Sequence, residues 1–131
     1  NYSTPCLFES GDRSTEVIFS SRDKGLSAVD VTSGKLAWEL AVFQSHVAVA
    51  SPVVADNYIV GVSGGVGVPE ELVTIQLQSQ KPARPLELYR IEQAAPFVPT
   101  PLVHQGMLFS VSDEGVALLG QALPEAKIIF R

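Results

Sequence analysis

The stretch SAVDVTSGKLAW, residues 27–38, decides the fold that this sequence predicts. A short apolar run ends at Asp30, and a polar turn follows before the chain becomes apolar again at Leu36. Asp30 can accept hydrogen bonds from backbone amides of the turn, and Gly34 can take the positive φ that a side chain resists. The pattern predicts two antiparallel strands joined by a tight turn. Trp38, on the outer strand, should bury a large apolar area and direct its indole N–H to an acceptor.

A four-part pattern recurs three times along the chain. Each copy opens with a small residue, a proline and an apolar run, and three further apolar runs follow, separated by turn residues. The prolines, 47 and 49 residues apart, are Pro5, Pro52 and Pro101. The fourth run of each copy carries an aromatic residue, and these residues are Trp38, Tyr89 and Phe130. Self-similarity at this period is the signature of a repeat architecture.

The repeated unit is typical of β-structure. Its runs are short, rich in Val, Ile, Leu and aromatic residues, and bounded by Gly, Asp, Asn, Ser and Pro, whereas helical spacing is nowhere sustained. A four-stranded unit of this length indicates a propeller blade. We therefore predict an all-β fold, a partial β-propeller of three four-stranded antiparallel blades. The blades are expected at about residues 1–45, 46–94 and 95–131.

Three blades are fewer than a closed propeller needs. Natural propellers typically have about four to eight blades, so three would leave two open apolar faces. We expect the chain to be a segment of a larger propeller. The alternative is a homo-oligomer in which two copies pair into a six-bladed ring.

The first copy resembles a known repeat. The stretch GLSAVDVTSGKLAWEL is similar to the repeat of the quinoprotein-like β-propellers, the pyrroloquinoline quinone (PQQ) repeat family. In that repeat a strand ends in Ala-x-Asp, the turn carries Thr/Ser-Gly-Lys, and Trp follows three residues later. The residues in those places are Ala28, Asp30, Ser33, Gly34, Lys35 and Trp38. The second and third copies keep the strands and lack this motif.

The resemblance implies two kinds of function. Some members of the family are dehydrogenases that bind PQQ and calcium in the central channel, and others are scaffolds that have lost the cofactor, such as the lipoprotein subunit of the outer-membrane β-barrel assembly machinery. The dehydrogenases often carry an adjacent Cys-Cys pair, whereas Cys6 is the single cysteine here. No calcium site of Glu, Asn and Asp and no catalytic base can be assigned.

We therefore predict a non-catalytic scaffold or protein-interaction segment without a cofactor or metal. Its partner would be a protein or the remaining blades of the parent chain. The alternatives are a segment of a quinone-dependent dehydrogenase and a propeller that binds a small ligand or carbohydrate. The resemblance also implies a periplasmic or exported protein.

Charge and hydropathy narrow the choice of partners. The 131 residues carry a formal net charge of −5 and contain no basic run, which argues against nucleic acid and anionic membranes as partners. Hydrophobic residues make up 46%, as in an ordinary globular protein. No apolar run approaches the roughly 18 residues of a membrane-spanning helix.

Two patterns invite a catalytic or metal-binding interpretation. GVSGG, residues 61–65, matches the Gly-x-Ser-x-Gly nucleophile elbow, but that elbow requires a strand, a turn and then a helix. Another strand is expected here, so a glycine-rich hairpin is favoured. The two histidines, His46 and His104, lie 58 residues apart without paired cysteines. A metal site is therefore not predicted, and His104 is interpreted as a partly exposed turn residue.

The remaining candidates receive structural interpretations. Asp23 and Asp113 occupy equivalent turns, RDKG and SDEG, and are interpreted as turn-building residues. Cys6 is interpreted as a small buried hydrophobic residue. Arg84 and Arg90 flank the outer strand of the second copy and are expected to face solvent.

Overall fold

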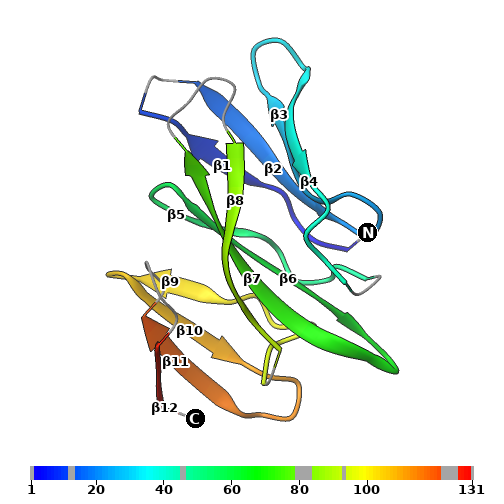
Figure 1. Ribbon diagram of the computed structural model, residues 1–131, viewed down its shortest axis with the longest axis vertical. Coiled ribbons are helices and arrows are strands. Elements are labelled where there is room, and N and C mark those ends of the chain that lie inside the picture. The colour runs from blue at the N-terminus through cyan, green and yellow to red at the C-terminus, as the bar shows by residue number, and fades with distance from the viewer. Residues whose placement is uncertain are drawn as a thin grey trace.

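The protein is all-β. The computed structural model describes residues 2–11, 14–44, 47–78, 84–92, 94–121 and 127–130, and no helix occurs among them. Twelve strands form three antiparallel four-stranded sheets, which follow one another along the chain. In Figure 1 the sheets succeed one another from top to bottom, so the second sheet lies between the other two. The predicted all-β fold is thereby confirmed.

Each sheet is a simple meander in which consecutive strands pair. The first sheet contains β1 (Cys6–Glu9), β2 (Thr15–Ser21), β3 (Gly25–Asp30) and β4 (Leu36–Leu40). The middle sheet contains β5 (Val53–Ala55), β6 (Tyr58–Gly65), β7 (Val68–Gln78) and β8 (Arg84–Ile91). The third sheet contains β9 (Leu102–His104), β10 (Met107–Val111), β11 (Ala117–Gln121) and β12 (Lys127–Phe130). The first strands of neighbouring sheets are in contact, β1 with β5 and β5 with β9, and so are β4 and β8.

The three sheets repeat the same strand register. One row of paired residues crosses each sheet, starting at the residue after the repeated proline and ending at the repeated aromatic residue. The rows are Cys6–Ile18–Ala28–Trp38, Val53–Val60–Thr74–Tyr89 and Leu102–Phe109–Leu119–Phe130. A β-bulge follows this row between the third and fourth strands of every sheet. The structure thus confirms the internal repeat, including the two copies that lack the turn motif.

Two hydrophobic cores hold the sheets together. Ile18, Leu26 and Trp38 of the first sheet pack with Ile59 and Ile75 of the middle sheet. The opposite face of the middle sheet packs against the third sheet, with Val60, Val62, Leu72 and Leu108 in this second core. The middle sheet is therefore buried on both faces, and each end sheet is buried on one.

The β3–β4 turn forms as the sequence motif predicts. Gly34 has a φ of 67° and donates its N–H to the Asp30 carbonyl. The Asp30 carboxylate accepts hydrogen bonds from the Ser33 N–H and hydroxyl, each 2.6 Å long. Ala28 is fully buried in the first core. Lys35 is exposed and lies one residue before β4.

This turn should make the stability of the protein depend on pH. The hydrogen bonds from Ser33 hold the pKa of the Asp30 carboxyl below its ordinary value of 3.8. A depressed pKa means that folding stabilises the ionised carboxylate. Asp30 therefore stabilises the folded protein at pH values above its ordinary pKa, and this stabilisation is lost as the pH falls through the depressed pKa. We expect Asp30→Ala to lower the free energy of unfolding at neutral pH. The variant should also lose less stability than the wild-type protein when the pH is lowered. Urea unfolding between about pH 6 and pH 3 measures this. An unchanged pH dependence would contradict the assignment, and Asp23→Ala is the matched control in an exposed turn.

Candidate functional site

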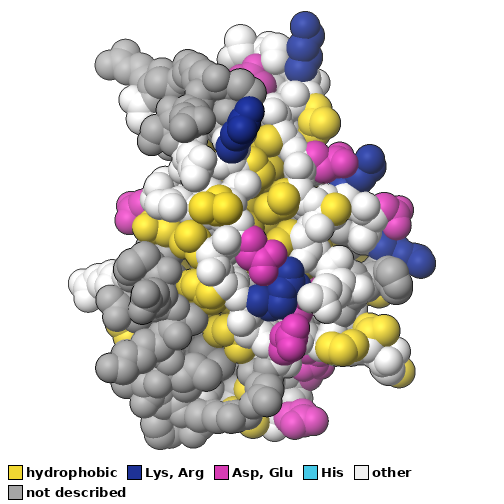
Figure 2. Space-filling view, in the orientation of Figure 1, with side chains coloured by type: hydrophobic (Ala, Val, Ile, Leu, Met, Phe, Trp, Pro, Cys, Tyr) yellow, Lys and Arg dark blue, Asp and Glu magenta, His cyan; other side chains and the backbone are white. Residues whose placement is uncertain are grey.

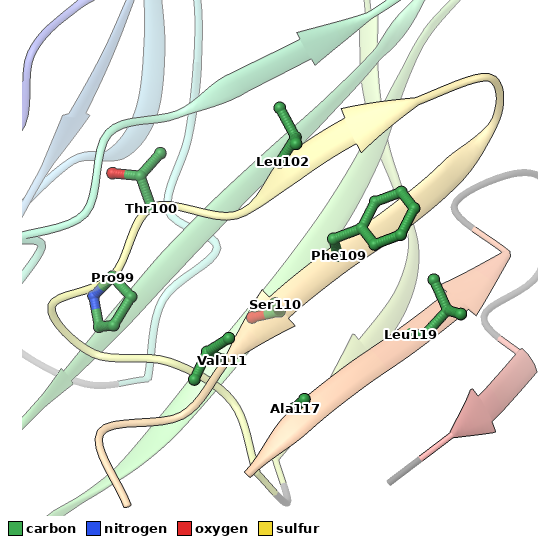
Figure 3. Close-up of a pocket in the computed structure, with 8 residues that line it drawn as sticks. All are labelled: Pro99, Thr100, Leu102, Phe109, Ser110, Val111, Ala117 and Leu119. Carbon is green, nitrogen blue, oxygen red and sulfur yellow. The ribbon is translucent and has the colours of Figure 1, made fainter. Parts of the chain in front are cut away.

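The third sheet carries an open apolar hollow on its outer face. The cavity has a volume of about 300 Å³. Its lining residues are Pro99, Thr100, Leu102, Phe109, Ser110, Val111, Ala117 and Leu119. Figure 3 shows Leu102, Phe109 and Leu119 rising from three neighbouring strands on the same side of the sheet. Leu102 is 62% exposed and Phe109 41% exposed, although the row that they occupy is buried or half-buried in the other two sheets.

The first sheet exposes an apolar face at the opposite end of the stack. The row on this face runs Leu7–Val17–Val29–Leu36 across all four strands. Leu7 and Leu36 are each 60% exposed, and Phe19 on the same face is 37% exposed. Both ends of the stack therefore present apolar side chains, which is the usual mark of an interaction surface.

The chemistry of the hollow suits apolar contact. None of its lining residues is charged, and the Thr100 hydroxyl already accepts a hydrogen bond from the Ser51 N–H at 3.1 Å. Small-molecule sites of similar volume add convergent polar groups that orient the ligand. On the side of the molecule drawn in Figure 2, basic side chains are separated by acidic and apolar ones and do not gather into a patch.

Comparison of the chain with protein-family models, with curated proteins and with solved structures finds no match. Its function is therefore inferred from its own geometry. None of the described segments forms a helix long and apolar enough to cross a membrane.

A buried ion pair within the middle sheet, between β7 and β8, was not predicted from the sequence. The Arg90 guanidinium pairs with the Glu71 carboxylate, and their side chains are only 16% and 3% exposed. Glu71 Oε1 also accepts hydrogen bonds from the Gln44 N–H at 2.6 Å and the Ser63 hydroxyl at 2.7 Å. Arg90 Nη2 donates to the Val42 carbonyl at 2.7 Å. The cluster attaches the segment after β4 to the middle sheet, and this role is structural.

The position of Arg90 corrects the sequence interpretation of the outer strand. Arg84 is exposed as expected, but the Arg90 side chain points into the structure and also pairs with Glu87 at 2.9 Å. The sequence signal for this arrangement is weak: Glu71 directly precedes the apolar residues Leu72 and Val73 in β7.

The nucleophile-elbow pattern forms a strand and hairpin, as predicted. Residues 61–65 lie at the end of β6, and β7 follows after a short turn at Val66 and Gly67. Ser63 is fully buried, and its hydroxyl donates a hydrogen bond to the Glu71 carboxylate. Its hydroxyl is therefore not positioned as an accessible nucleophile.

The candidate thiol and metal ligands do not form a reactive site among the described residues. Cys6 is half-buried against the first core, and burial raises the pKa of its thiol to about 11. This favours the protonated, unreactive form. His104 is exposed at the end of β9, as predicted, whereas His46 lies outside the described residues. Across the described part of the chain, no three His, Cys, Asp or Glu residues cluster as metal ligands would.

The two turn aspartates are not equivalent in their contacts. Asp23 lies in its turn with an exposed side chain, near Arg22 at 3.8 Å. Asp113 also lies in a turn, but its carboxylate accepts hydrogen bonds from the backbone N–H groups of Phe97 and Val98, at 2.7 and 3.3 Å. Asp113 thus lies in a turn as interpreted, and its carboxylate also makes contacts outside that turn. It ties the linker between the middle and third sheets to the β10–β11 turn.

Proposed function

We propose that this chain is a non-catalytic β-propeller scaffold, a segment of a PQQ-like repeat protein that acts through protein contacts. The observation that carries the proposal is the exposed apolar row on each end sheet. Leu102 stands at the position of Cys6 and Val53, which both pack into a core. A position that packs half-buried against a core in two repeats and is exposed in the third indicates that a further surface covers it.

Two features of the sheets support a propeller, although the fourth strands β4 and β8 are in contact as well as the first strands. The first strands of consecutive sheets contact one another, as inner strands do around a propeller axis. The repeated register and bulge make the sheets equivalent units. The surfaces that cover the two open faces would belong to further blades or to a protein partner. A periplasmic or exported location belongs to the same proposal, since it follows from the resemblance of residues 25–40 to the PQQ repeat.

Two other functions make different predictions. A segment of a quinone-dependent dehydrogenase would respond to PQQ and calcium, and a ligand-binding propeller would respond to a sugar or another small molecule. The hollow on the third sheet is large enough for a small ligand, but its lining lacks the convergent polar groups that would orient one.

A ligand screen separates the three functions. The chain is titrated with PQQ plus calcium, sugars and nucleotides while its unfolding temperature is followed, and dye-linked oxidation of alcohols and sugars is measured in parallel. A scaffold predicts no saturable shift and no turnover. A saturable rise in Tm with quinone and calcium would establish the dehydrogenase function instead, and a rise with a sugar alone would establish ligand binding.

A further inference from the structure

The two internal junctions between sheets share a pattern of side-chain size. At the first junction, Leu26 of β3 packs directly on Gly61 of β6, where an added Cβ would lie 3.0 Å from Leu26 Cδ1. The registers show that Leu72 of β7 is the equivalent of Leu26, and Ser110 of β10 the equivalent of Gly61. Each internal junction thus combines a leucine on the third strand of one sheet with a small residue on the second strand of the next.

On the open faces of the two end sheets, the large and small side chains of this pattern are exchanged. The third-strand position that holds Leu26 and Leu72 is occupied by Ala117 in the third sheet, where the hollow lies. The second-strand position that holds Gly61 and Ser110 is occupied by Phe19 in the first sheet. Phe19 is 37% exposed on the open face. One end therefore lacks a large side chain at the junction, and the other end projects one.

We propose that the outer face of the third sheet binds the outer face of the first sheet in a second copy of this chain, with Phe19 of that copy filling the hollow beside Ala117. The proposal rests on the proposed function in that both open faces are covered by further sheets. In this arrangement β9 of one copy would also contact β1 of the other. Leu102 and Leu7, which are 62% and 60% exposed, would then pack together. The equivalent positions at the first internal junction, Cys6 and Val54, both pack into the first core.

The size reversal favours a second copy over an unrelated sheet. A sheet with a small residue at the second-strand position, as in the two internal repeats, would leave a void over Ala117, and voids are costly. Two copies in head-to-tail contact close into a ring when the rotation between them is half a turn, and the same interface is then used twice. The result would be a ring of six sheets, within the usual range of about four to eight for propellers.

Light scattering on the 131-residue chain tests this pairing. We expect a discrete particle of twice the 14.0 kDa mass of one chain. Ala117→Leu should collide with Phe19 and weaken the dimer by about tenfold or more, and Phe19→Gly should weaken it comparably by leaving a cavity. The double variant Phe19→Gly with Ala117→Leu restores the leucine-on-glycine contact seen at Gly61 and should recover most of the dimer.

The control is Val66→Asp, which changes a fully exposed residue in the β6–β7 turn and should leave the mass unchanged. A chain that stays monomeric at every concentration would overturn the pairing. So would a dimer that Ala117→Leu does not weaken, or a double variant that dimerises no better than the singles. Circular dichroism confirms that each variant folds. These outcomes are independent of the quinone and sugar screen, so the pairing can fail while the scaffold function stands.

Discussion

Replacing Trp38 by alanine is expected to lower the free energy of unfolding by about 3–5 kcal/mol, as for other large buried aromatic residues. Trp38 is 6% exposed and belongs to the core between the first and middle sheets. Its indole N–H donates to the Glu16 carboxylate at 2.8 Å, and Glu16 is itself 7% exposed. The substitution therefore opens a cavity and also removes a donor from a buried carboxylate. Urea unfolding followed by circular dichroism measures the loss.

Trp38→Phe separates these two effects. It keeps an aromatic ring in the core and removes the indole N–H, so we expect a loss of about 1–3 kcal/mol, the cost of leaving Glu16 without that donor. Val66→Ala, at a fully exposed position, should change stability by less than about 0.5 kcal/mol. If Trp38→Ala destabilised the protein no more than Val66→Ala, the first core would not depend on Trp38 as the structure indicates.

The second large effect is expected at the buried ion pair. Arg90→Met should lower stability by about 3–5 kcal/mol, because it leaves the Glu71 carboxylate buried without its cationic partner. It also removes the hydrogen bond to the Val42 carbonyl, which holds the segment after β4. Chemical unfolding at neutral pH provides the measurement.

The double variant Arg90→Met with Glu71→Gln tests the origin of this loss. Glutamine is uncharged and can still accept hydrogen bonds from the Gln44 N–H and the Ser63 hydroxyl. The double variant should therefore be more stable than Arg90→Met alone. Arg22→Met breaks a solvent-exposed pair with Asp23 and should cost less than about 1 kcal/mol. Equal losses for Arg90→Met and Arg22→Met would show that burial of the Glu71–Arg90 pair contributes nothing to stability.

Much of the fold could be predicted from short stretches of sequence. The turn after β3 could be predicted from the residues between Asp30 and Gly34, because its side-chain hydrogen bonds and its positive φ are local. The residue after each repeated proline and the repeated aromatic residue stand at the two ends of the row that crosses each sheet, and the registers place them at equivalent positions. Short apolar runs bounded by turn residues, without helical spacing, were enough to predict strands.

The candidate site was less accessible to sequence reasoning. The open faces were expected from the number of repeats, but the positions that line them, such as Phe19 and Ala117, become apparent only when the strand registers are aligned. Nothing in the sequence near Arg90 indicates that its partner is Glu71, 19 residues away and across a hairpin.

The sequence by itself determined the strands, the turns and the threefold repeat, because these follow from local hydrogen bonding and from short apolar runs that recur between turn residues. Only the tertiary structure decided which polar groups are buried and which apolar groups are exposed. Asp113 illustrates the first point, since its carboxylate binds amides of Phe97 and Val98 that folding brings to it. Leu102 illustrates the second, because its exposure depends on whether another sheet lies over it, and burial is a property of the neighbouring surface rather than of the residue.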